Sequence, residues 1–213
     1  MRHHLAGIAA ILFIGHAAAA ATDPRVAGQT IVSESLPRVR VKVAPEIRYL
    51  GEHPIRIRDV AAGKRFVFAE TTPDGKVRRM VIAQFEGFLP GIDDIYRYRF
   101  DGAPVLGGLP FRQNGFASST RAELAENPGS EVEATMRFLA DKRVSAPDGL
   151  AIYRFVTIGD DTRKNEMILF YMEPLEALGI ADASKSLSPA ALGKLAEHAR
   201  GALTIEGYPA EKP

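Results

Sequence analysis

Short runs of alternating apolar and polar residues dominate the first half of the chain. They span residues 39–43, 55–58, 66–72, 77–88 and 96–100, and they are rich in β-branched and aromatic side chains. A period of two with this composition is typical of strands that bury one face. Turn-forming residues separate the runs, so we expect neighbouring runs to pair as antiparallel strands.

The clearest turn is Thr-Pro-Asp-Gly-Lys at residues 72–76. Proline pre-sets one turn residue and glycine adopts a positive φ easily, which favours a three-residue hairpin loop with Thr72 opposite Lys76. The register that follows predicts the chemically sensible cross-strand pairs Glu70–Arg78, Phe68–Met80 and Phe66–Ile82.

The second half of the chain mixes helices with a strongly apolar hairpin. Residues 150–158 and 166–172 are apolar on both faces, which is typical of central strands that are covered on both sides. Capping patterns predict three helices, at residues 120–126, 130–143 and 188–200. We expect residues 22–37 to form an irregular arm and residues 103–117 to be a Gly- and Pro-rich loop with a possible tight turn at Asn114-Gly115.

This order of elements predicts an α+β fold in one domain, residues 38–213. We expect a mainly antiparallel, curved sheet of about seven strands, packed against two or three late helices with a cavity between them. An open barrel whose mouth is plugged by helices is the alternative. About 190 residues are enough to build one hydrophobic core.

The first 21 residues have the pattern of a cleavable signal peptide. A short basic start is followed by an apolar run and by alanines that precede Thr22. The alternative, a membrane anchor, is disfavoured because a spanning helix needs about 20 predominantly apolar residues and this run is shorter and diluted by alanine. The pattern predicts a periplasmic or secreted protein, and without cysteine a lipid anchor of the bacterial lipoprotein kind is excluded.

Composition narrows the function classes. Arg2 is the only charged residue of the leader, so the rest of the chain has equal numbers of acidic and basic residues, which disfavours nucleic acid as a partner. The absence of cysteine excludes thiol catalysis, zinc–thiolate sites and iron–sulfur clusters. Neither a nucleophile elbow nor a phosphate-binding glycine loop is present, and we expect no cofactor.

Basic residues are paired along three of the predicted strands. Each pair shares a strand face and is flanked by apolar residues that point the other way. If these strands are neighbours, their side chains line one surface that binds carboxylate, phosphate or sulfate groups. The alternative is a solvated face with counter-charge from Glu123, Glu126, Glu131 and Glu133. The three pairs are Arg40 with Lys42, Arg56 with Arg58, and Arg97 with Arg99.

Three further residues are candidates for ligand binding inside the predicted cavity. Gln84 and Glu86 share a strand face with apolar neighbours, so they project polar atoms into an apolar space. Arg154 lies in the middle of an apolar strand, where a charge is costly unless it is paired. We expect either a buried Arg154–carboxylate pair or an anchor for an acidic head group.

The remaining polar residues favour structural roles. His53 and His198 are isolated, and Asp93-Asp94 and Asp160-Asp161 lack the spacing of a calcium loop, so turn formation explains them better.

The sequence therefore favours an exported binding or carrier domain for an amphiphilic or anionic small molecule held between sheet and helices. One alternative is a domain that interacts with an envelope protein, and another is a hydrolase that uses Glu86, Asp93 or Asp160. A hollow interior distinguishes the first possibility from the others.

Overall fold

The computed structural model describes residues 23–208, so the predicted leader lies outside the described residues. Every pair of strands is antiparallel. The strands are β1 (Arg25–Ala27), β2 (Thr30–Ser33), β3 (Val39–Val43), β4 (Arg48–Ile57), β5 (Ala61–Thr71), β6 (Val77–Phe88), β7 (Val105–Leu106), β8 (Leu109–Pro110), β9 (Arg112–Ser119), β10 (Gly149–Ile158), β11 (Asn165–Pro174) and β12 (Leu203–Gly207). The helices are α1 (Thr120–Glu126), α2 (Glu131–Asp141), the 3-10 turn η1 (Leu175–Leu178) and α3 (Pro189–Ala202).

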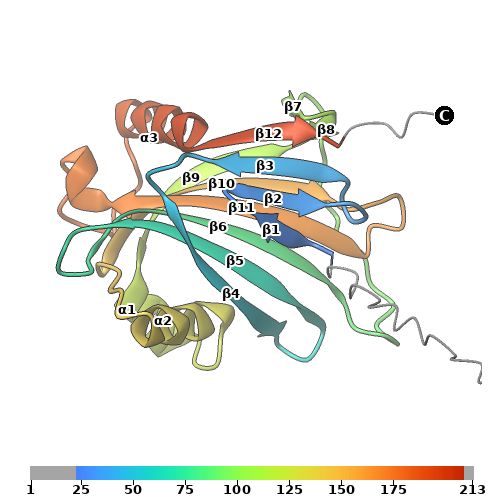
Figure 1. Ribbon diagram of the computed structural model, residues 1–213, viewed down its shortest axis with the longest axis horizontal. Helices are drawn as coiled ribbons and strands as arrows, with labels where there is room; N and C mark the ends of the chain where they lie inside the picture. The colour runs from blue at the N-terminus through green and yellow to red at the C-terminus, as the bar shows by residue number, and fades with distance from the viewer. Residues whose placement is uncertain (1–22, 209–213) are drawn as a thin grey trace, which may run out of the picture.

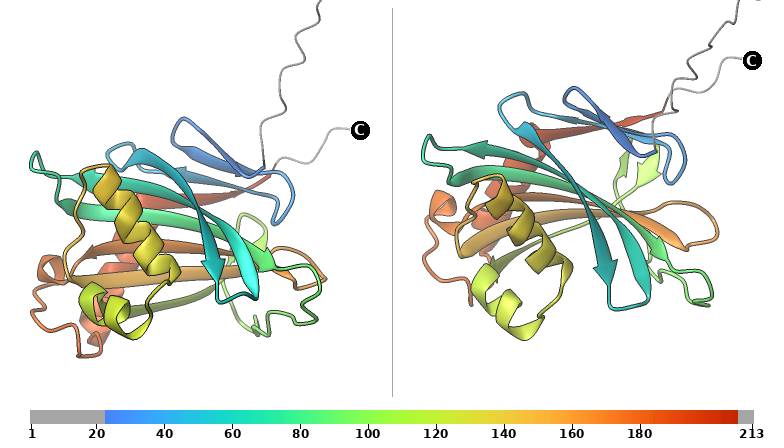
Figure 2. Two further views of the ribbon diagram at one scale, coloured as in Figure 1. Left: turned by 90° about the horizontal axis from the view of Figure 1, so that it is seen from below. Right: turned by 60° about the horizontal axis from the view of Figure 1, so that its bottom comes forward.

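A twisted six-stranded sheet, in the order β4-β5-β6-β11-β10-β9, forms the middle layer (Figure 1). A four-stranded sheet, β1-β2-β3-β12, packs on one of its faces together with α3. Helices α1 and α2 lie on the opposite face, and Figure 2 shows α2 laid across the strands. The α+β class and the late helices are confirmed, and the main sheet has six strands where about seven were expected. It is an open sheet with β4 and β9 at its edges, which contradicts the barrel alternative.

Strand alternation divides the apolar side chains between the two faces of the middle sheet. Phe66 and Phe68 of β5 are fully buried in the core shared with the four-stranded sheet. Met80 and Ile82 of β6 belong to a smaller cluster under α2, where Leu139 of the helix meets them. Burying each such side chain contributes about 1.5–3 kcal/mol, so both faces of the sheet stabilise the fold.

The β5–β6 hairpin is confirmed, and its predicted register is wrong by one residue. Thr72 N–H donates to the Lys76 carbonyl at 2.8 Å, as the turn chemistry predicts. Beyond the turn, however, Glu70 lies opposite Arg79, because Arg78 is the extra residue of a β-bulge. The slip places Phe68 opposite Val81, so the aromatic residues of β5 face the larger core and Met80 faces α2.

Three predicted segments differ in the structure. Residues 22–37 are not an irregular arm, because β1 and β2 form a hairpin that pairs with β3. Asn114-Gly115 is not a turn: it lies within β9, and a Cβ on Gly115 would approach Leu192 of α3 to 2.4 Å, so glycine allows the helix to pack closely. Residues 96–100 are not a strand, although their side chains alternate between half-buried and exposed.

The helix predictions are confirmed with small shifts at the ends. Ser130 caps α2 and Ser188 caps α3, with side-chain oxygens that accept from Glu133 and Ala191 N–H groups. The cap of α1 is Ser119 and not Thr120. Among residues 23–208, the structure contains no helix with the length and apolarity needed to cross a membrane.

Candidate functional site

A cavity of about 330 Å³ lies between the middle sheet and helices α1 and α2. Its floor is made by β5, β6, β11, β10 and β9, and its roof by residues of α1 and α2, such as Val132 and Met136. The sequence predicted a hollow between sheet and helices, and the structure contains one.

The sheet face under α1 and α2 changes from apolar to polar along β6 and β11, from the pairs that line the cavity to a pair of carboxyl groups beside it. Met80 lies opposite Met172, and Ile82 lies opposite Phe170. The next pairs along the two strands are Gln84–Ile168 and then Glu86–Glu166. The side-chain period of two keeps all four pairs on the same face of the sheet.

Arg65 is the most buried charge of the cavity wall, with 4 % of its surface exposed. Its Nε donates to Gln84 Oε1 at 2.6 Å, and its Nη1 donates to the Glu131 carbonyl and to Thr135 Oγ1, both at 2.8 Å. Burial lowers the pKa of Arg65 to about 10, although the nearby Glu131 and Glu86 charges oppose the shift. The guanidinium therefore stays charged at neutral pH, and these bonds tie β5 and β6 to α2.

His53 extends this polar cluster to the edge of the sheet. Its Nε2 lies 3.2 Å from Thr135 Oγ1 and its Nδ1 lies 3.0 Å from the Pro54 carbonyl. Burial lowers the pKa of His53, which favours the neutral imidazole. Both ring nitrogens of His53 thus contact groups of the protein itself.

Arg154 of β10 also lines the cavity, and it differs from Arg65 in its partners. Its Nε donates to Asn114 Oδ1 at 3.1 Å, and its guanidinium carbon lies 5.9 Å from the centre of the Phe116 ring. Within residues 23–208, no carboxylate oxygen lies within 4.0 Å of this half-buried guanidinium. The prediction of a buried Arg154–carboxylate pair is therefore wrong. The N–H groups of the two Nη atoms remain available as hydrogen-bond donors.

Glu86 and Glu166 are directly opposite each other on β6 and β11, and both are buried. The Tyr96 hydroxyl donates to Glu86 Oε1 at 2.8 Å, and Gln84 Nε2 donates to Glu86 Oε2. Burial raises the pKa of Glu166 to about 8, and the adjacent Glu86 carboxyl adds to the rise. Two carboxyl groups that share a buried site cannot both ionise easily, so this pair holds one proton at neutral pH.

An extended segment, which we term the strap (residues 92–103), packs beside the Glu86–Glu166 pair, which it contacts through Tyr96. It has no strand pairing, and Arg163 holds it instead, because its Nη2 donates to the carbonyls of Tyr96 at 2.6 Å and Tyr98 at 2.7 Å. The Tyr96 ring stacks on Phe88 at a centroid distance of 4.6 Å. Aromatic packing and side-chain bonds to carbonyls explain why this alternating segment does not need a neighbouring strand.

The predicted arginine surface does not form. Arg40 and Lys42 belong to the four-stranded sheet, Arg56 lies at the end of β4 in the other sheet, Arg58 follows it in a turn, and Arg97 and Arg99 lie on the strap. Most of these side chains pair with local carboxylates: Lys42 with Glu206 at 2.7 Å, Arg56 with Asp59 at 2.9 Å, Arg97 with Asp94 at 2.6 Å and Arg99 with Asp101 at 3.8 Å. Of the predicted counter-charges, Glu133 pairs with Arg137 of its own helix.

The carboxylates named for the hydrolase alternative do not converge. Glu86 is buried next to the cavity and, contrary to the sequence prediction, does not line it, whereas Asp93 lies exposed on the strap, 3.8 Å from Lys164 Nζ. Asp160 lies in the β10–β11 turn and accepts from Thr162 N–H at 3.0 Å. The partner of Glu86 is Glu166, which sequence reasoning did not place in the site; the β6–β11 register would have been needed to find it.

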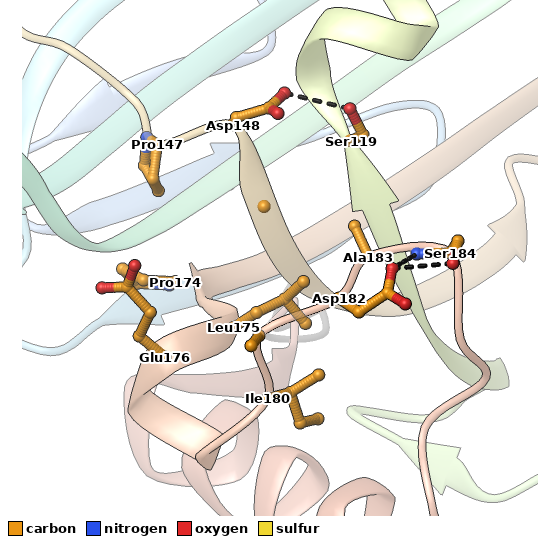
Figure 3. A pocket seen from close by; sticks show the side chains of 12 residues that line it. Ser119, Pro147, Asp148, Pro174, Leu175, Glu176, Ile180, Asp182, Ala183 and Ser184 are labelled. Carbon is orange, nitrogen blue, oxygen red and sulfur yellow. Dashed lines mark hydrogen bonds between the residues drawn. The ribbon is translucent and has the colours of Figure 1, made fainter.

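A second hollow, of about 510 Å³, lies among loops near η1 (Figure 3). Two of its carboxylates already accept hydrogen bonds: Asp148 accepts from Ser119 Oγ at 3.0 Å, and Asp182 accepts from Ser184 N–H and Oγ. This hollow lacks both the apolar floor and the available guanidinium of the cavity under α1 and α2.

His198 of α3 makes a contact that the sequence did not predict. Its Nδ1 lies 3.0 Å from both oxygens of the buried Glu173 carboxylate, which also accepts from the Tyr171 hydroxyl. The contact joins α3 to β11 and lies apart from the residues that line the cavity.

Comparisons with models of known protein families, with curated protein sequences and with solved structures find no significant match to this chain.

Proposed function

We propose that this protein is an exported binding domain for an amphiphilic anion, held in the cavity between the middle sheet and helices α1 and α2. The observation that carries the proposal is the half-buried Arg154 guanidinium at the wall of an otherwise largely apolar cavity. An apolar body and an anionic head satisfy these two features together.

The size of the cavity limits the ligand. An enclosed space of about 150 Å³ holds one benzene molecule, so a cavity of about 330 Å³ accommodates roughly a dozen non-hydrogen atoms. The methionine side chains of the lining, Met80, Met136 and Met172, are flexible and polarisable, and they adapt to ligands of different shape. A medium-chain carboxylate such as decanoate meets the limits of size and polarity.

Arg154 is the anchor in this proposal because the other cavity arginine is already engaged. The Nε and Nη1 atoms of Arg65 make three hydrogen bonds, to Gln84, Glu131 and Thr135, so a ligand would compete with bonds that hold α2 in place. Arg154 makes one side-chain bond through Nε, which leaves its planar fork of Nη groups for a carboxylate or phosphate.

Calorimetric titration with decanoate tests the proposal. The unmodified chain is expected to bind decanoate, and Arg154→Met is expected to weaken binding roughly 10- to 100-fold, because a hydrogen bond to a charged group contributes about 1.5–3 kcal/mol. Arg99→Met is the matched control, since Arg99 is 91 % exposed on the strap. Decanol has the same chain without the charge, and it should bind the unmodified chain and Arg154→Met equally.

Two results contradict the proposal. One is the absence of decanoate binding to the unmodified chain. The other is an equal loss of affinity in Arg99→Met and Arg154→Met, which would place the anion on the exposed surface.

A further inference from the structure

The Glu86–Glu166 pair lies beside the cavity, next to the lining pair Gln84–Ile168 on the same sheet face, and the Arg154 charge acts on Glu166. Both oxygens of Glu86 accept hydrogen bonds, from Tyr96 and from Gln84. Glu166 is 3 % exposed, and its Oε2 has no hydrogen-bond partner in the part of the chain that the structure describes. A buried carboxyl with a free oxygen is the natural holder of the shared proton.

The groups that face Glu166 set the charge of this region. They are Glu86 on β6, Tyr96 and Tyr98 on the strap, and Arg154 on β10; Arg65 on β5 lies beyond Glu86, and Arg112 on β9 lies against Tyr98. Burial raises the pKa of Tyr98 to about 12 and also raises that of Tyr96, so both phenols stay neutral in the physiological range. Ionisation of Glu166 is therefore the change that alters the local charge near neutral pH.

Resting on the proposed function, we infer that the cavity binds its anionic ligand together with one proton, which the Glu86–Glu166 pair holds. Two reasons support the coupling. A second carboxylate beside the cavity repels an anionic head group at Arg154, and inside a protein this repulsion is stronger than in water. An ionised Glu166 also attracts the Arg154 guanidinium and so competes with the ligand for its anchor.

The coupling has a defined sign. When the ligand leaves above the pKa of the pair, the carboxyl of Glu166 releases its proton to solvent, and when the ligand returns, the pair takes a proton up. Because one proton is bound with each ligand, affinity falls as the pH rises through the pKa of Glu166, which is about 8, and the fall approaches about tenfold per pH unit well above it.

The test is titration of the full chain with decanoate at pH 6, 7, 8 and 9. Decanoate stays ionised throughout, since an exposed carboxyl titrates at about pH 4–5. The dissociation constant of the unmodified chain is expected to stay level between pH 6 and 7 and to rise about fivefold between pH 8 and 9. Glu166→Gln should give one dissociation constant at every pH, whereas the exposed control Glu126→Gln should follow the unmodified chain.

A second measurement needs no variant. Near pH 8, the binding enthalpy of the unmodified chain should differ between phosphate and Tris buffers, because the proton taken up comes from the buffer. Binding of decanoate that is equally tight from pH 6 to 9, with one enthalpy in both buffers, overturns the proton coupling and leaves the proposed function standing. Failure of decanoate to bind at any of these pH values overturns both.

Discussion

Replacing Glu166 with glutamine is expected to make the protein more stable, and increasingly so as the pH rises. Glu166 is 3 % exposed, opposite Glu86, and its pKa is raised from 4.5 to about 8 mainly by burial and then by Glu86. The folded state therefore holds a proton that the unfolded chain releases. The stability that this proton contributes is fully present below pH 4.5 and is lost as the pH rises through about 8.

The size of the effect follows from the interval between the two pKa values. Each pH unit in this interval changes the free energy of unfolding by about 1.4 kcal/mol, so the unmodified chain loses about 3–4 kcal/mol between pH 5 and pH 8 through this group alone. Glutamine keeps the shape of the neutral carboxyl and does not titrate. The difference between Glu166→Gln and the unmodified chain should therefore be small at pH 5 and reach that size at pH 8.

The assay is urea unfolding at pH 5, 6, 7 and 8, followed by far-UV circular dichroism because the chain has no tryptophan. Glu126→Gln is the control, since Glu126 is exposed at the end of α1 and should change the pH profile little. Parallel stability profiles for the unmodified chain and Glu166→Gln would refute the idea that the buried pair holds a proton at neutral pH.

Two further substitutions test the packing around the site. Gly115→Ala should lower the free energy of unfolding by about 1–3 kcal/mol, because the added Cβ would press on Leu192 of α3. The control Gly193→Ala, on the open side of α3, should raise the free energy of unfolding by about 0.5–1 kcal/mol, and equal effects of the two substitutions in urea unfolding would argue against the close packing of β9 and α3. Thr135→Val should cost about 1–3 kcal/mol by leaving the buried Arg65 short of an acceptor, and the same measurement on Thr204→Val, an exposed strand position, should show little change.

Local chemistry in the sequence predicts much of the secondary structure. The Thr72–Lys76 turn, the caps Ser130 and Ser188, and the apolar β10–β11 hairpin all depend on residues close in sequence, and all are confirmed. Features that depend on distant contacts are missed. The bulge at Arg78 and the close approach of α3 to Gly115 result from tertiary packing that no local pattern records.

The candidate site shows the same division. Alternation along β6 is enough to place Gln84 and Glu86 on one face with apolar neighbours, and the structure puts Gln84 and Arg154 in the cavity wall. The partnership of Glu86 with Glu166 depends on the β6–β11 register, which the sequence does not specify. The alternating pattern of residues 96–100 wrongly predicted a strand. Side chains that alternate between packed and exposed positions need only a surface beneath them and not a paired strand.

The most direct test is a crystal structure of the protein soaked with decanoate that carries bromine on its terminal carbon. The bromine should appear by anomalous scattering on the apolar floor near Met80 and Phe170, with the carboxylate within hydrogen-bond reach of the Arg154 guanidinium. Bromine found only in the open hollow near η1 or on the outer surface, with the cavity under α1 and α2 left without it, would contradict the proposed binding site.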